Sequence, residues 1–151
     1  MTKSNWNASG LLFLRLAIGI IFVAHGWQKA FVFGPDGVAG GFAALGIPFP
    51  YANAVFITGL EFIGGLAILA GVATRLVAPL LSATMVVAIA TAHLANGFFA
   101  SNNGYEFPLV LLLASVALTL TGAGSYSIDA AFFGKQRPDV AERESSVRLA
   151  A

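Results

Sequence analysis

Six polar side chains stand within or beside the long apolar stretches of this sequence: His25, Lys29, Glu61, His93, Asn96 and Glu106. Imidazoles and carboxylates exchange protons, while ammonium and amide groups donate hydrogen bonds, so such a set can hold and protonate a polar ligand. Ionisable groups at membrane depth are costly and usually face a protein interior. These residues are therefore the candidates for a polar site.

The composition indicates a membrane protein. Of 151 residues, 58% are hydrophobic and 10% are charged, and the mean hydropathy is +0.83, whereas a soluble domain has about 25% charged residues. The net charge of +1 gives no basic face for nucleic acid. Because the chain has no cysteine, it forms no disulfide, thiolate nucleophile, Cys-ligated zinc site or iron–sulfur cluster of its own.

Hydropathy predicts an all-α bundle of four transmembrane helices. A span needs about 20 apolar residues, and four segments qualify: 11–33, 51–73, 76–95 and 106–122. The first apolar run is too long for the core of a signal peptide, so we interpret it as a retained helix. We expect a domain over 11–134, preceded by residues 1–10 and followed by a disordered charged tail over 135–151.

Basic residues predict the orientation of the bundle. They occur at both ends of the chain and, as Arg75, in the turn between the second and third spans, whereas the other two connections have no Lys or Arg. The positive-inside rule then places both termini in the cytoplasm. After the fourth span, the stretch SYSIDAAFFGK, residues 125–135, is typical of a short interfacial helix, with Ser127 as its cap, Asp129 in its first turn and Gly134 at its end.

With this orientation, the candidate residues gather in the outer half of the membrane. At 1.5 Å per residue, His25 lies roughly 21 Å along the first span, with Lys29 one turn further on the same face. Glu61 falls near the midplane, and His93 lies in the outer half. The outer mouth adds two more polar residues, Asn96 and Glu106. The sequence therefore predicts one shared polar site.

Structural roles are open for each residue taken singly. Lys29 can extend to the membrane surface, and Glu61 can form an ion pair with Arg15 or Lys29, or lie neutral among apolar groups. The two histidines, His25 and His93, can join helices by hydrogen bonds.

Metal and haem chemistry are minor alternatives. His25 and His93 lie at similar depths and could be axial ligands of a haem. A metal site is not expected, because Glu61 lies too deep to meet both histidines. Glu106 precedes Pro108 at a helix start, where favourable interaction with the helix dipole alone can explain it.

The sequence also resembles the DoxX family of small bacterial four-helix membrane proteins. The pieces that carry the resemblance run in order from residue 14 to about 133: LRLAIGIIFVAHGWQKAF, LGIPFP, GLEFIGGLAILAGVATRL, AHLANGFF, YEFPLVLLL and SIDAAF. The resemblance implies a multi-pass protein of the bacterial inner membrane that is associated with quinone-linked redox metabolism. The six candidate residues all fall on positions where this sequence matches the family.

Three functions follow as hypotheses. The first is a subunit of a quinone-dependent oxidoreductase, in which the polar site binds a quinone. The second is a non-catalytic scaffold that anchors a soluble redox enzyme or a larger membrane complex. The third is a pathway for protons or small solutes, for which four short helices give little room without a homo-oligomer. No covalent cofactor is expected in any of these cases.

Overall fold

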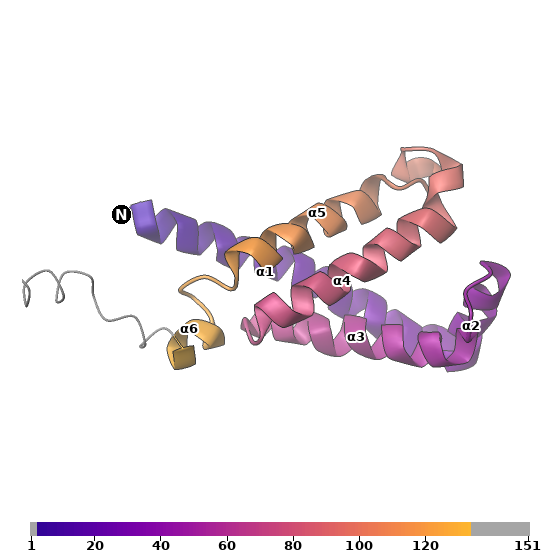
Figure 1. Cartoon of the computed structure of the whole chain (residues 1–151), viewed down its shortest axis with the longest axis horizontal. Helices are drawn as coiled ribbons and strands as arrows, with labels where there is room; N and C mark the ends of the chain where they lie inside the picture. Colours follow the sequence, from indigo (N-terminus) through magenta and orange to yellow (C-terminus); the bar gives the residue numbers. More distant parts are fainter. Residues whose placement is uncertain (1–2, 134–151) are drawn as a thin grey trace, which may run out of the picture.

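The computed structural model describes residues 3–133, which form helices and connecting loops without a strand (Figure 1). The α-helices are α1 (Lys3–Trp27), α2 (Gly34–Ala44), α3 (Pro50–Ala70), α4 (Thr74–Ala88), α5 (Glu106–Thr121) and α6 (Ile128–Phe133). Two π-helical segments extend α1 and α4, η1 (Gln28–Phe33) and η2 (Ile89–His93), and two short 3₁₀ turns follow, η3 (Leu94–Asn96) and η4 (Ala100–Asn102). The predicted helix end at Gly134 and the tail over 135–151 lie outside the described residues.

The described helices confirm an all-α membrane protein. Three helical stretches are long and apolar enough to cross a bilayer: Trp6–Ala44, Pro50–Ala70 and Thr74–Asn96. The fourth predicted span corresponds to α5, which has 16 apolar-rich residues and therefore rises about 24 Å, less than a hydrocarbon core of about 30 Å. The count of four full spans, and the orientation of the termini, stay predictions.

The connection between the first two spans differs from the sequence interpretation, because much of it is helical. Gly34 has a φ of +70° and bends the chain away from η1. Pro35 in the first turn and Asp36 beside it then favour the start of α2. As a result, α2 lies against α3 at the end of the molecule opposite the N-terminus (Figure 1).

Helices α1 and α3 pack closely as an antiparallel pair because glycines stand where the two backbones meet. A Cβ atom on Gly65 would lie 2.7 Å from the backbone nitrogen of Val23, and one on Gly19 would lie 3.0 Å from the carbonyl oxygen of Gly65. Gly26 likewise faces the backbone of Phe62. Small residues permit such approach in lipid, where packing rather than water drives helix association. The contact sets the register that brings the end of α1 beside the middle of α3.

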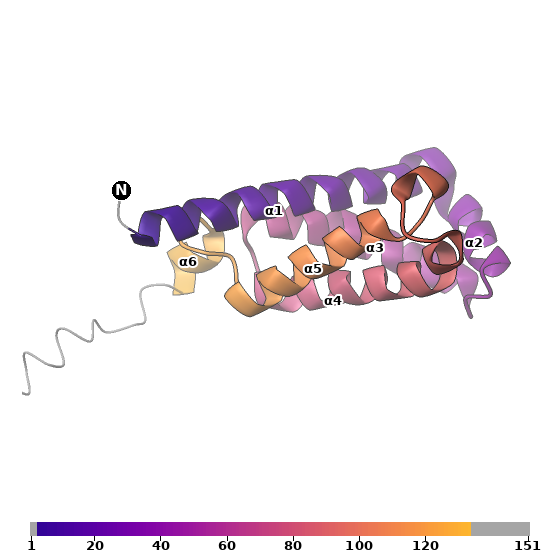
Figure 2. The same cartoon turned by 90° about the horizontal axis from the view of Figure 1, so that it is seen from above.

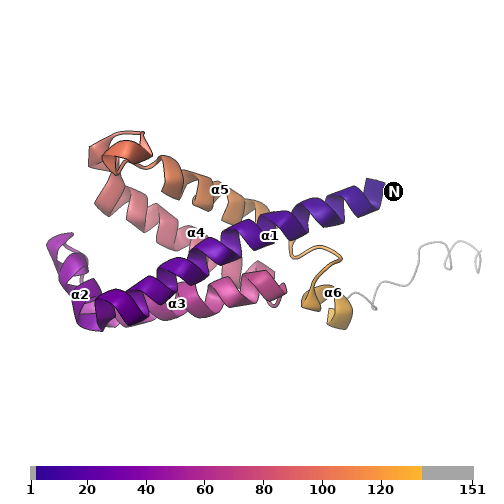
Figure 3. The ribbon, with the colours of Figure 1, turned by 180° about the vertical axis from the view of Figure 1, so that it is seen from behind.

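The second pair, α4 and α5, packs across from the first, and the hydrophobic core fills the space between them near the α3–α4 turn. This core is a cluster of buried residues from four helices, Ile18, Phe22, Ile68, Ala78, Leu81, Met85, Leu111 and Leu118. The two pairs converge at the α3–α4 turn and diverge toward the end that carries α2 (Figures 1 and 3). Viewed from above, α2 and the loop before α5 share one end, and α6 lies at the other (Figure 2).

Arg15 joins the converging ends and is not paired with Glu61, so that predicted ion pair is wrong. Its side chain is buried, and it donates four hydrogen bonds of 2.7–3.0 Å to backbone carbonyls. The acceptors are Ile68 and Leu69 in the last turn of α3, and Ala123 and Tyr126 in the loop before α6. The last carbonyls of a helix lack partners within the helix. The guanidinium therefore satisfies them and neutralises the negative end of the α3 dipole.

Two polar residues near α6 complete this end of the bundle. The hydroxyl oxygen of Ser127 accepts a hydrogen bond from the backbone nitrogen of Ala130, so the predicted cap of the short helix is confirmed. Asp129 lies in the first turn of α6 as expected, but its carboxylate also accepts bonds from the backbone nitrogens of Ala73 and Thr74, at 2.8 and 3.1 Å. Asp129 therefore caps α4, which ties α6 to the α3–α4 turn.

Candidate functional site

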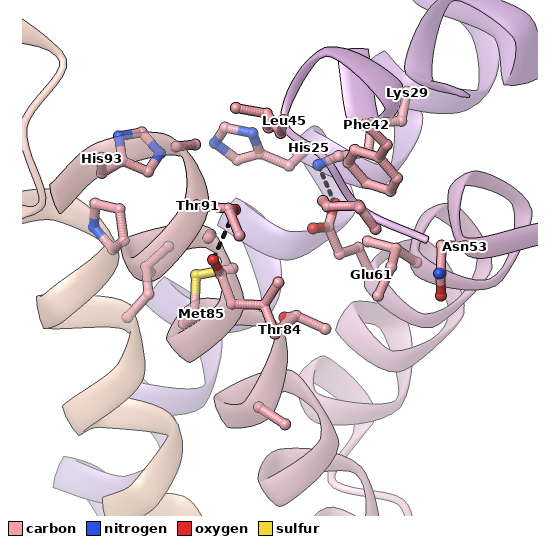
Figure 4. Close-up of a pocket in the computed structure, with 18 of the residues that line it drawn as sticks. His25, Lys29, Phe42, Leu45, Asn53, Glu61, Thr84, Met85, Thr91 and His93 are labelled. Carbon is pink, nitrogen blue, oxygen red and sulfur yellow. Dashed lines mark hydrogen bonds and ion pairs between the residues drawn. The ribbon is translucent and has the colours of Figure 1, made fainter. Parts of the chain in front are cut away.

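A cavity of about 880 Å³ lies between the two helix pairs, on the side of the core away from the α3–α4 turn. Its wall is mostly apolar, with Phe22, Met85 and Leu111 of the core as part of its lining. Phe42 and Leu45 from the α2 region line it as well. The polar residues in the wall are Asn103 and seven residues labelled in Figure 4: His25, Lys29, Asn53, Glu61, Thr84, Thr91 and His93. Four of the six predicted site residues thus line one cavity.

Lys29 and Glu61 form an ion pair across the α1–α3 contact. The Nζ atom of Lys29 lies 2.5 Å from Oε2 of Glu61, and the two side chains are 20% and 4% exposed. This is the alternative partner that the sequence left open for Glu61. Because a lone buried charge would be costly, the ammonium and carboxylate groups compensate each other's burial. The pair gives the cavity one strongly polar wall (Figure 4).

His25 lies one turn before Lys29 and its imidazole is exposed to the cavity. Its ring centroid is 6.2 Å from that of Phe107 on α5, a contact that joins the two helix pairs. In Figure 4 the ring lies between His93 and the Lys29–Glu61 pair. His25 is therefore placed to contact a ligand that reaches the ion pair.

His93 ends the π-helical segment η2 and faces His25 across the cavity (Figure 4). Its Nδ1 atom lies 2.8 Å from the carbonyl oxygen of Asn103. Since a carbonyl only accepts, Nδ1 carries the hydrogen, and Nε2 of the neutral ring is left as an acceptor. The loop before α5 thus fixes the tautomer of His93, which can accept a hydrogen bond from a ligand hydroxyl.

Both π-helical segments border the cavity, one through Lys29 and the other through Thr91 and His93. A π-helical turn contains one more residue than an α-helical turn, so it rotates the residues that follow it around the helix axis. Such turns occur often at functional sites. The sequence offers no local signal for them.

Asn96 and Glu106 do not line the cavity. Asn96 donates from Nδ2 to the carbonyl oxygens of Ala92 and Asn103, at 3.0 and 3.3 Å. Glu106 accepts a hydrogen bond of 2.9 Å from the backbone nitrogen of Ala100. Both residues hold the loop whose Asn103 positions His93. They support the site from behind rather than contacting what fills it.

The sequence interpretation missed four polar residues in the cavity wall. Thr84 and Thr91 could have been found, because they are seven residues apart and therefore share a helix face. Their hydroxyls donate to carbonyls one turn earlier, of Leu81 and Val87. The other two, Asn53 and Asn103, reach the cavity only through the folding of loops and helix starts. Within residues 3–133, no three His, Asp or Glu side chains gather as a metal site would require.

The chain is similar in sequence to a known family and to three known proteins. The sequence model of the DoxX family matches residues 10–94. "Putative oxidoreductase CatD" of Bacillus subtilis is 37% identical over 87% of this chain and 93% of its own length. An uncharacterized protein of Haemophilus influenzae is 34% identical over 83% of this chain and 92% of its own. Inner membrane protein YqjF of Escherichia coli is 36% identical over 80% of this chain and 89% of its own. No solved structure matches the chain.

Proposed function

The chain belongs to the DoxX family, and we propose that its cavity binds the head group of a quinone, as part of a redox system in the bacterial inner membrane. One observation carries the proposal: an apolar cavity of about 880 Å³ has an ion pair on one wall and a histidine of fixed tautomer facing it. A pocket with apolar walls and a few convergent polar groups is typical of a small-molecule site.

The chemistry of these groups suits both redox states of a quinone. The ammonium of Lys29 can donate a hydrogen bond to a quinone carbonyl, and Nε2 of His93 can accept one from the hydroxyl of the reduced form. Glu61, beside Lys29, can take up or release a proton when that pairing changes. The residues bind the ligand and handle its protons, while the electrons come from a partner.

Two comparisons support the setting. The relative from B. subtilis carries the name of an oxidoreductase, and the relative from E. coli that of an inner membrane protein. Both align over most of their length with this chain. Because the chain has no cysteine, no thiol of its own can carry the electrons, which in this proposal come from a partner.

Quinone binding to the purified protein in lipid nanodiscs tests the proposal. Lys29→Gln combined with Glu61→Gln removes both charges at nearly constant volume. The lost charged hydrogen bond contributes about 1.5–3 kcal/mol, so we expect the affinity for the quinone to fall about tenfold to a hundredfold. Asp36→Asn is the control, because it removes an exposed carboxylate at the same end of the molecule that does not line the cavity. Equal affinity in the double variant and the wild type would disprove the proposal.

A further inference from the structure

Helices α3 and α4 contact each other near their shared turn. At Gly64 a Cβ atom would lie 3.1 Å from Cγ1 of Val77 and 3.7 Å from Cδ2 of Leu81. One turn further from the α3–α4 turn, Leu60 on α3 and Thr84 on α4 both line the cavity. The cavity thus begins where the contact between the two helices ends, and the helices diverge from that level (Figure 1).

The cavity wall along this gap is apolar and reaches the surface of the protein. Phe56 on α3, and Leu80 and Val87 on α4, line the cavity and are 59%, 50% and 49% exposed. Ala83, between the latter two, is exposed as well. The part of each helix concerned lies within a predicted membrane span. The rim therefore faces lipid through these four apolar side chains. The polar side chains that α3 and α4 add nearby, Asn53 and Thr84, donate hydrogen bonds to the carbonyl oxygens of Pro48 and Leu81.

The charged and imidazole side chains of the cavity lie at helix contacts other than the α3–α4 gap. The ion pair crosses the α1–α3 contact, and His93 lies at the end of η2 beside the loop before α5. On the α1–α5 side, the rings of His25 and Phe107 approach each other. The cavity is thus divided into a polar end and an apolar exit between α3 and α4.

We infer that the gap between α3 and α4 is a lateral portal, through which the ligand enters from the bilayer and in which its apolar chain stays. This inference rests on the proposed function, since the polar end must hold the head group. A ligand with a polar head and an apolar chain matches both ends of the cavity, because the chain keeps contact with apolar side chains and lipid. A water-soluble ligand would leave the apolar rim without a role.

A plug in the portal tests this inference. Ala83→Trp fills the rim, whereas Ala90→Trp adds the same bulk at an exposed alanine that does not line the cavity. The probes are a benzoquinone with a decyl chain and the same head group without the chain, in nanodiscs. Affinities are expressed per concentration in the lipid phase, so that the partitioning of the chain cancels. The measured quantity is the affinity for the chained probe divided by the affinity for the chainless probe.

We expect Ala83→Trp to lower this ratio at least tenfold and Ala90→Trp to leave it unchanged. Phe56→Ala, which widens the rim from the α3 side, should speed association of the chained probe more than that of the chainless one. An unchanged ratio in Ala83→Trp, with the head group still bound, overturns the portal alone. If neither probe binds the wild type, the proposed function fails, and the portal with it.

Discussion

Arg15→Met should strongly destabilise the protein, because this arginine joins three segments through their backbone carbonyls. One of its four acceptors, the carbonyl oxygen of Ile68, keeps a second donor in the backbone nitrogen of Gly71 at 3.1 Å. The other three carbonyls lose the donor that Arg15 provides. A buried acceptor without a partner costs about 1–3 kcal/mol. Allowing for some access of water at this end, we expect the free energy of unfolding to fall by about 3–5 kcal/mol.

Unfolding in mixed micelles with increasing SDS, followed by far-ultraviolet circular dichroism, measures this loss. Arg75→Met is the control, because Arg75 is an exposed arginine near the same turn, and a surface substitution usually changes stability by less than about 0.5 kcal/mol. Arg15→Lys should lie between the two, since a single ammonium group does not reproduce the planar fork of the guanidinium. Equal losses for Arg15→Met and Arg75→Met would refute the reasoning.

Three further predictions concern the packing, the capping and the orientation of the bundle. Gly65→Ala should lower the free energy of unfolding and separate the Lys29–Glu61 pair, because its Cβ would meet the backbone of α1. Gly59→Ala, which has open space around it, should be neutral or stabilising in the same unfolding assay. Asp129→Asn should cost about 0.5–2 kcal/mol in the free energy of unfolding, as expected for a weakened helix cap. The chain has no native cysteine, so single cysteines report the orientation. Asn102→Cys should react with an impermeant maleimide at the outer face of intact cells, and Arg75→Cys should not. The reverse pattern would contradict the predicted orientation.

The proposed site depends on features that the sequence shows only in part. His25, Lys29, Glu61 and His93 stand out because ionisable groups are rare in apolar segments, and all four line the cavity. Asn96 and Glu106 stand out for the same reason but hold a loop. Polarity in an apolar context identifies a residue as unusual, yet the direction of its side chain depends on loop geometry that no periodicity encodes.

The sequence by itself determined the helical class, the membrane environment and the approximate spans. These follow from the free energy of transferring each residue into lipid, which is a local property that sums along a helix. The cap at Ser127 is local in the same sense.

Only the tertiary structure decided which charges meet. Arg15 and Lys29 lie toward opposite ends of the same apolar run, and Glu61 lies near the middle of another. Depth in the membrane alone therefore allowed Glu61 to pair with either Arg15 or Lys29. The glycine contacts set an antiparallel register in which Arg15 meets the last turn of α3 and Lys29 meets Glu61. The two π-helical segments and the folded α2 then complete the cavity. Register and helix rotation are properties of two packed surfaces together, so neither is written in one segment of the chain.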